Sequence, residues 1–179
     1  MDKDIRVPFG HEEVKNLRCG DKVYITGEIY TARDAAHKRM IETLERCEEL
    51  PIDINNSIIY YAGPAPAKPG RVIGSCGPTT SCRMDAYTPK LIELGLTGMI
   101  GKGERDEAVI TAMKKYGSVY FGAIGGAGAL IAECVKKSEV VAYEDLGTEA
   151  IRRLTVEKFP VVVVIDSFGN SLYNRQDIN

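Results

Sequence analysis

A chain of 179 residues with 44% apolar and 27% charged side chains is long enough to bury one core of ordinary size. Its 23 basic and 25 acidic side chains leave a net charge of −2, which gives no electrostatic case for a nucleic-acid partner. Apolar runs such as residues 161–165 are far too short to span a membrane, and the charged start of the chain lacks the apolar stretch of a signal peptide. These observations favour a single cytoplasmic domain over residues 1–179.

The first third of the chain predicts an edge element, a strand and a helix. Residues 1–20 are polar without a clear period and are interpreted as an extended arm or an edge strand. β-branched residues alternate over residues 22–29, which predicts a strand. Thr31 is then the expected N-cap of a helix that ends before Pro51, with one apolar stripe facing the core. That stripe consists of Ala36, Met40, Leu44 and Cys47.

Two further strands are predicted at residues 57–61 and 71–75, on either side of a segment rich in proline and glycine. That segment, residues 63–70, is interpreted as a surface loop rather than a linker, because strand patterns continue on both sides of it. Beyond it, helical and strand patterns alternate. The expected elements are helices at 85–94, 106–116, 126–136 and 148–152, strands at 98–100, 118–121, 140–143, 154–156 and 161–166, and a turn at 169–170.

This order of elements predicts the fold class. The alternation in the middle of the chain favours a partly parallel sheet, and the β-rich ends favour additional antiparallel strands. The expected fold is therefore α/β, a mixed sheet with flanking helices. The glycine-rich segment 122–128 fits neither G-x-G-x-x-G nor a P-loop, so it is interpreted as a tight strand-to-helix turn.

The cysteines are odd in number and scattered, which is a poor basis for a disulfide framework and is typical of reduced thiols. They are Cys19, Cys47, Cys76, Cys82 and Cys134. Cys76 and Cys82 are close enough in sequence to share a metal, but there is no CxxC pair, and His11 and His37 are the only histidines. We therefore expect free thiols and no metal site in this chain.

Residues 74–85 form the most informative segment of the chain. Residues 77–78 are a glycine and a proline that predict a sharp turn, Thr79 and Thr80 offer two hydroxyls, and Arg83 lies at the entrance of a predicted helix. Backbone N–H groups at a helix start attract anions, and an arginine can bind a carboxylate through two parallel hydrogen bonds. The segment therefore predicts a loop that binds a carboxylate or another oxyanion.

Three cations occupy comparable places in the predicted pattern. Arg33, Arg83 and Lys102 each follow a predicted strand and precede a predicted helix. The carboxyl ends of parallel strands lie at one edge of a sheet, where ligands collect. If the three strands are parallel neighbours, the cations meet around a substrate with two carboxylates. The alternative is that each is an ordinary solvated surface charge.

Residues 77–80 and 83–85 together resemble the signature of the β subunit of class I, iron–sulfur-dependent fumarases and tartrate dehydratases. The likeness extends from residue 20 to residue 170. Its other matching segments are residues 27–37, 101–103 and 125–126. The resemblance implies the swivelling β/β/α fold.

The resemblance also assigns roles to individual residues. It implies that Arg33, Arg83 and Lys102 bind the dicarboxylate and that the hydroxyls of Thr79 and Thr80 face it. Thr79 corresponds to the residue proposed as the base that takes a proton from the carbon next to a carboxylate. A free threonine hydroxyl is far too weak a base near pH 7, so its alkoxide needs nearby cations or N–H donors. Arg83 and Lys102 are suitable stabilisers.

Three neighbouring residues receive other interpretations. Cys82 departs from the family pattern, since many relatives carry a small residue there, and its thiol either lies near the substrate or fills a gap. Asp85 is expected to act as a cap or to orient Arg83. His37 lies one helical turn beyond Arg33 and is expected to have a structural or surface role.

The leading functional hypothesis is that the chain is an enzyme subunit for the reversible hydration of fumarate to malate. The resemblance implies a [4Fe–4S] cluster in a partner α subunit, where its open iron binds the leaving hydroxyl as a Lewis acid. It also implies an assembly with two copies of each subunit. Tartrate dehydration is the second hypothesis, and a non-catalytic module that binds dicarboxylates or aids assembly is the third.

Overall fold

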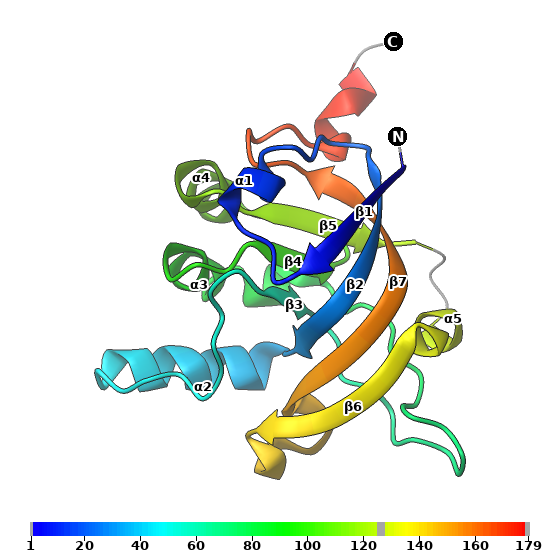
Figure 1. Ribbon diagram of the computed structural model, residues 1–179. Coiled ribbons are helices and arrows are strands. Elements are labelled where there is room, and N and C mark those ends of the chain that lie inside the picture. The colour runs from blue at the N-terminus through cyan, green and yellow to red at the C-terminus, as the bar shows by residue number, and fades with distance from the viewer. Residues whose placement is uncertain (1, 125–127, 178–179) are drawn as a thin grey trace.

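The computed structural model describes residues 2–124 and 128–177, which form a seven-stranded mixed sheet with helices around it (Figure 1). The strands are β1 (Asp2–Val7), β2 (Lys22–Thr31), β3 (Ile58–Tyr60), β4 (Gly98–Gly101), β5 (Val119–Ala123), β6 (Val135–Ala142) and β7 (Ile151–Ile165). Strands β1 to β5 are successive parallel neighbours, whereas β7 runs antiparallel to β2, β5 and β6. The predicted mixed α/β sheet is confirmed, but antiparallel pairing among the described strands involves only β7, since β1 at the other end is parallel to β2.

The sheet closes on itself because β7 pairs with two strands of its parallel part. Residues 161–165 of β7 pair with β5, and residues 152–162 pair with β2. Strands β2, β3, β4, β5 and β7 therefore form a closed barrel, with β1 attached to β2 and β6 attached to β7. β1 confirms the expected edge strand for residues 2–7, whereas residues 11–14 of the expected arm form a short helix.

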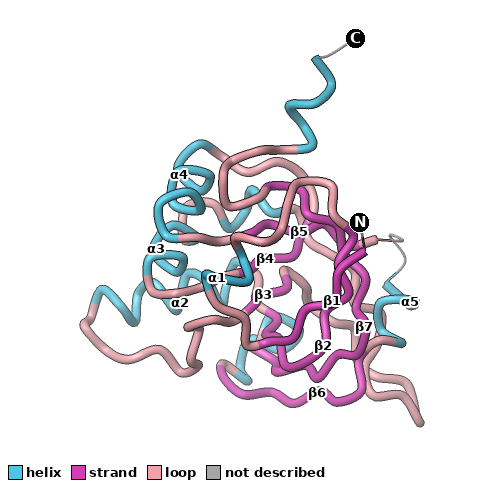
Figure 2. The backbone as a smooth tube through the Cα atoms, turned by 45° about the horizontal axis from the view of Figure 1, so that its top comes forward, coloured by secondary structure: helices cyan, strands magenta, loops and turns pink. Residues whose placement is uncertain are grey.

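Helices cover the barrel on two sides. They are α1 (His11–Val14), α2 (Asp34–Glu45), α3 (Thr88–Glu93), α4 (Glu107–Tyr116) and α5 (Gly128–Glu133), with short 3₁₀ turns η1 (Ser81–Met84), η2 (Glu144–Glu149) and η3 (Leu172–Asp177). Helices α2, α3 and α4 lie on one side of the strands and α5 lies on the other (Figure 2). No helix among residues 2–124 and 128–177 is long and apolar enough to cross a membrane.

Alternation along the strands divides the buried side chains between two cores. Successive strand residues point to opposite faces, so Ile25, Tyr60 and Phe121 belong to the core inside the barrel. Their neighbours on the outer face, such as Met99 and Tyr120, pack in a second core with residues of α2, α3 and α4. This second core holds the helices against the barrel.

The start of α2 differs from the prediction. β2 continues through Thr31, because that residue still pairs with β3 and β7. The N-cap is therefore Arg33, whose extended backbone precedes the first helical residue, and Thr31 is not the cap. The helix ends at Glu45, several residues earlier than expected, so Cys47 lies beyond it and is exposed instead of continuing the buried stripe.

Residues 71–75 are not a strand, so this prediction was wrong. They form the returning arm of a long loop whose two arms are joined by a hydrogen bond from the Ala65 N–H to the Ser75 carbonyl, 2.9 Å. Val72 is half exposed while Ile73 is buried. The glycines and prolines on both sides favour turns, and the apolar run is too short to override them.

The carboxyl-terminal third contains more strand than predicted. The helix expected at 126–136 is α5, which ends at Glu133 and is followed by β6. Residues 125–127 of the expected glycine turn lie outside the described part of the chain. The helix expected at 148–152 is absent, since η2 ends at Glu149 and β7 begins at Ile151. The strands expected at 154–156 and 161–166 are one long strand, β7. Pairing with β2, β5 and β6 imposes this length on a sequence that contains a proline at residue 160.

Candidate substrate-binding site at the carboxyl edge of the barrel

Arg33 is placed by the junction between β2 and α2. The Ala32 N–H donates to the Tyr60 carbonyl, 3.1 Å, which holds the end of β2 beside β3. The guanidinium of Arg33 then lies against Gly63, where an added Cβ would come within 2.5 Å of the arginine Cζ. Its Nε is 3.7 Å from a carboxylate oxygen of Glu149. Gly63 is therefore the residue that makes room for this cation.

Thr79 and Thr80 reach the same edge through backbone bonds. The Thr79 N–H donates to the Tyr61 carbonyl at the end of β3, 2.6 Å. The Lys102 N–H, just beyond β4, donates to the Thr79 carbonyl, 3.3 Å, and the Ser81 N–H donates to the Lys102 carbonyl, 2.8 Å. Thr80 and Lys102 consequently form a short parallel bridge. The absence of a strand at 71–75 does not separate these residues, because the loop itself returns to β3 and β4.

Arg83 approaches from η1 and contacts the start of α2. Its Nε donates to Asp34 Oδ2, 2.8 Å, and its Nη2 lies 2.6 Å from the same oxygen. The Arg83 side chain is 51% exposed, so this ion pair is open to solvent and to exchange with another carboxylate. Lys102 is exposed as well. The five residues singled out from the sequence thus lie at the carboxyl ends of β2, β3 and β4, three parallel neighbours.

Buried polar atoms without a hydrogen bond gather at the start of α2. Among the described residues, Thr31 Oγ1, Arg33 Nε, Asp34 Oδ1 and His37 Nε2 are buried and lack a hydrogen-bond partner. Leaving a buried polar group unsatisfied costs on the order of 1–3 kcal/mol. The N-terminus of α2 also carries a partial positive charge from its backbone N–H groups. Arg33 Nε is a donor whereas Asp34 Oδ1 is an acceptor, so the unsatisfied atoms at this end of the helix are of both kinds.

His37 is a buried neutral base beneath Arg33. Its Nδ1 hydrogen-bonds to the Arg33 carbonyl, 2.8 Å, and because a carbonyl only accepts, Nδ1 carries the proton. Its ring meets the Tyr61 ring edge-on at 5.4 Å. Burial is the main cause that lowers the pKa of His37 to about 4, and the charge of Arg105 contributes. A structural role is thus supported, and a surface position is excluded.

The lowered pKa predicts how stability depends on pH. The unfolded chain binds a proton on His37 more readily than the folded chain, so the stabilisation is complete above pH 6.5 and is lost as pH falls toward 4. Between pH 6.5 and pH 4.5 we expect His37 alone to remove about 2 kcal/mol from the free energy of unfolding. Urea unfolding of wild type and His37→Gln at both pH values measures this. Equal losses in the two proteins would contradict the assignment.

Asp85 does not serve Arg83, contrary to one of the two expectations for it. Its Oδ1 accepts from Arg105 Nε, 2.7 Å, and its Oδ2 accepts from the Asp106 N–H, 3.0 Å. Asp85 follows η1 and is buried, whereas Arg83 is exposed and pairs with Asp34. Sequence reasoning missed Arg105 altogether, because a Gly-Glu-Arg-Asp run resembles a solvated turn.

The cysteines near the site differ in their surroundings. Cys82 is exposed on η1 beside Arg83, which agrees with a position near the ligand. Cys76 is buried, and this burial raises the pKa of its thiol to about 12. The Cys76 thiol is therefore protonated near pH 7.

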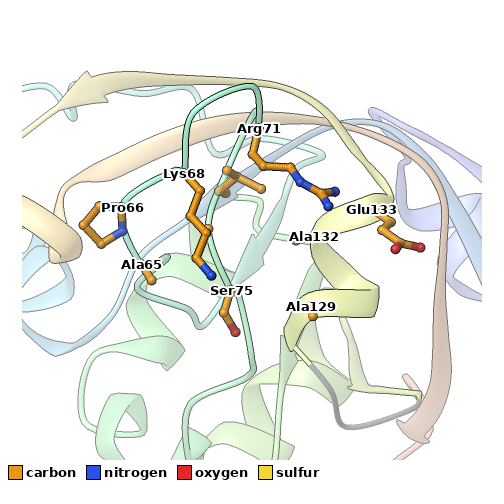
Figure 3. A pocket seen from close by; sticks show the side chains of 10 residues that line it. Ala65, Pro66, Lys68, Arg71, Ser75, Ala129, Ala132 and Glu133 are labelled. Carbon is orange, nitrogen blue, oxygen red and sulfur yellow. The ribbon is translucent and has the colours of Figure 1, made fainter.

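A cavity of about 330 Å³ lies beside the candidate site but is not lined by its residues. It lies open between the two arms of the 63–76 loop and α5, and the side chains of Lys68, Arg71, Ser75 and Glu133 line it (Figure 3). The carbonyl of Gly128, the first residue of α5, accepts from the Cys76 N–H at 3.2 Å. Contact between α5 and the loop fixes the segment that leads into Thr79.

Comparison with known proteins points in the same direction as the resemblance. The family described as Fumarase C-terminus matches residues 3–176. The chain is 44% identical over 170 residues to a protein named putative L(+)-tartrate dehydratase subunit beta from Methanocaldococcus jannaschii, with 92% of this chain and 87% of that protein covered. It is 41% identical to an aerobic class I fumarate hydratase of Salmonella typhimurium and 42% identical to the mitochondrial fumarate hydratase 1 of Leishmania major. The chain spans 29% and 30% of the lengths of these two fumarate hydratases.

Proposed function

Because the chain belongs to the family described as Fumarase C-terminus, we propose that it is the β subunit of a hydro-lyase that interconverts fumarate and malate. The observation that carries this proposal is the gathering of three cations and two hydroxyls at the carboxyl edge of the barrel. Cations on three neighbouring segments suit a substrate with two carboxylates. The proposal includes the swivelling β/β/α fold. Superposition of this chain on an experimental structure of a relative would test that part of it.

In the proposed reaction Arg33, Arg83 and Lys102 bind and orient the two carboxylates. The planar guanidinium of Arg83 exchanges its exposed contact with Asp34 for a substrate carboxylate, which it binds at two points. Arg33 acts from the start of α2, where the helix adds its own positive end. Binding both carboxylates fixes the position of the carbon that loses its proton. Such orientation can supply a large part of the reduction in activation free energy.

We assign the proton transfer to Thr79. In the direction from malate to fumarate, the Thr79 oxygen takes the proton from C3, the electrons of that C–H bond form the double bond, and the C2–O bond breaks as hydroxide leaves. The oxygen acts as an alkoxide, which nearby positive charge must stabilise. We assign that charge to Lys102, whose backbone N–H binds the Thr79 carbonyl, and to Arg83, four residues after Thr79.

We propose that a partner α subunit would hold a [4Fe–4S] cluster, which would supply Lewis-acid chemistry for the hydroxyl that leaves. The residues of this chain do not fit such a group. Within the described ranges, no cluster of three or more His, Cys, Asp or Glu side chains is arranged to hold a metal ion. The proposed assembly contains two copies of each subunit and works in the cytoplasm.

Absence of the cluster from this chain has a direct test. We expect the purified chain to be colourless and to contain no stoichiometric iron, because cluster ligation requires several thiolates around one point. Visible absorption and iron analysis after anaerobic purification measure this. A broad band near ~400 nm with about four irons per chain would place the cluster here instead.

Reconstitution tests the proposed function itself. The chain alone is expected to show negligible hydration of fumarate, and addition of a cluster-bearing α subunit under anaerobic conditions is expected to give turnover. A non-catalytic module predicts the reverse, namely tight dicarboxylate binding by the isolated chain and no turnover in any mixture. Calorimetry with malate and a fumarate absorbance assay distinguish the two outcomes.

Tartrate dehydration is the second candidate function, favoured by the relative from Methanocaldococcus jannaschii, which the chain matches over 87% of its length. Tartrate carries one more hydroxyl than malate, so discrimination rests on one additional polar contact. The ratio of kcat/KM for malate and L(+)-tartrate in the reconstituted enzyme decides between them.

A further inference from the structure

Arg105 differs from the other cations of the chain in being buried. It lies between β4 and α4, and its side chain has 0% exposure. Of the lysines and arginines whose exposure the structure describes, only Arg105 belongs to the buried class. An arginine cannot lose its charge in a protein, so its burial requires compensating contacts.

Those contacts come from several directions. Arg105 Nε donates to Asp85 Oδ1, 2.7 Å, while Nη2 donates to the Tyr61 hydroxyl, 3.1 Å, and to Thr88 Oγ1, 3.0 Å. The guanidinium also lies 5.1 Å from the ring centroid of Tyr61 and 5.0 Å from that of Tyr120. Most donors of this one side chain are therefore engaged, and two aromatic rings lie within reach of its charge.

Two of these partners, Tyr61 and Asp85, and Arg105 itself lie next to segments of the proposed site. The Tyr61 carbonyl accepts the Thr79 N–H, Asp85 lies two residues after Arg83, and Arg105 itself follows the turn of Lys102. The guanidinium thus connects the end of β3, the end of η1 and the segment after β4.

Tyr120 adds a second connection between the same segments. Its hydroxyl donates to the Gly103 carbonyl, 2.8 Å, and hydrogen-bonds to Ser81 Oγ, 2.7 Å. Ser81 in turn lies so close to Gly101 that no side chain fits at residue 101. The threonine segment and the lysine turn are therefore joined by side chains as well as by backbone.

We propose that Arg105 is a positioning residue that holds Thr79, Arg83 and Lys102 in mutual register. Burying two charges usually costs as much free energy as their attraction returns, and apolar replacements of buried pairs are often neutral or stabilising. The main contribution of the Arg105–Asp85 pair is therefore geometric. The expected effect of Arg105 on catalysis rests on the proposed function. The relative placement of the three segments does not, because it is a property of this chain alone.

The test combines two variants with a matched control. Arg105→Met with Asp85→Asn removes the ion pair while keeping volume and an oxygen for the Asp106 N–H, and Tyr120→Phe removes one hydroxyl. Arg46→Met with Glu48→Gln makes the same change at an exposed pair beyond the far end of α2. Unfolding temperature and circular dichroism establish that each variant is folded. If the double variant fails to fold, Tyr120→Phe carries the test.

Amide hydrogen exchange of the chain alone provides the decisive measurement. We expect exchange of the Lys102 and Ser81 amides to become about tenfold faster or more in both test variants, with the Ile25 amide in β2 unchanged. The control variant should match wild type at all three amides. Unchanged exchange at Lys102 and Ser81 in folded variants overturns the inference.

Kinetics of the reconstituted enzyme link the register to catalysis. We expect kcat/KM to fall at least tenfold in both test variants. Arg105→Lys should lower kcat/KM nearly as much, because lysine lacks the planar, forked guanidinium of arginine. Full activity in the folded double variant overturns the positioning role. If wild type itself gives no turnover while exchange still responds as expected, the proposed function fails and the register stands.

Discussion

Thr79→Val is expected to lower kcat of the reconstituted enzyme by a factor of about 10²–10⁴, the usual contribution of a general base. Valine keeps the shape of threonine and removes the only atom of that side chain able to take a proton. The two backbone bonds of Thr79, to Tyr61 and Lys102, do not involve the side chain and should persist. Dicarboxylate binding through the three cations should therefore survive nearly intact.

Two measurements separate proton transfer from binding. Exchange of the malate C3 proton with solvent needs the base alone, so it should vanish in Thr79→Val and return in Thr79→Ser. Thr80→Val is the matched control, since it removes the neighbouring hydroxyl on the same bridge to Lys102. Normal C3 exchange in Thr79→Val would leave Thr79 as a binding residue, and the base would then belong to the partner subunit.

Arg83→Lys is expected to lower kcat/KM by about 10²-fold or more, equivalent to roughly 3 kcal/mol of transition-state binding. Lysine keeps the positive charge but loses the planar fork that holds a carboxylate at two points. The folded state should lose little, because an exposed ion pair such as Arg83–Asp34 contributes only about 0–1 kcal/mol. Steady-state kinetics together with the unfolding temperature measure the two effects.

Asp34→Asn is the control for that experiment. It breaks the same ion pair from the other side and leaves the arginine in place. We expect it to retain most of the activity, since Arg83 stays free to bind substrate. If Asp34→Asn and Arg83→Lys lose equal activity, Arg83 acts by holding the start of α2 and does not bind the substrate.

The candidate site could be predicted from the sequence because its parts are local. Residues 77–80 form a turn, and Arg33 and Lys102 follow strands whose patterns are strong. Parallel order of β2, β3 and β4 then suffices to bring the segments to one edge. The mistaken strand at 71–75 did no harm to this prediction, because Thr79 pairs with Tyr61 and Lys102 directly.

The rest of the fold depends on contacts that no local pattern announces. β7 is one strand because it pairs with β2, β5 and β6. Pro160 interrupts the strand pattern in its sequence, and Lys158 has a left-handed backbone conformation. Burial of Arg105 depends on Tyr61, Asp85 and Tyr120, which are far from it in the sequence. Pairing partners and buried charges are tertiary properties, so they override local propensity.

Closure of the barrel by β7 also limits how the site can move. An open sheet can splay between neighbouring strands, but β2, β3 and β4 belong to a ring in which each strand is held on both sides. Arg33, Thr79 and Lys102 are anchored at the ends of these strands and cannot separate without breaking the ring. We therefore expect substrate entry and release to require displacement of this whole chain as a rigid body relative to the proposed partner subunit, with the cations moving together.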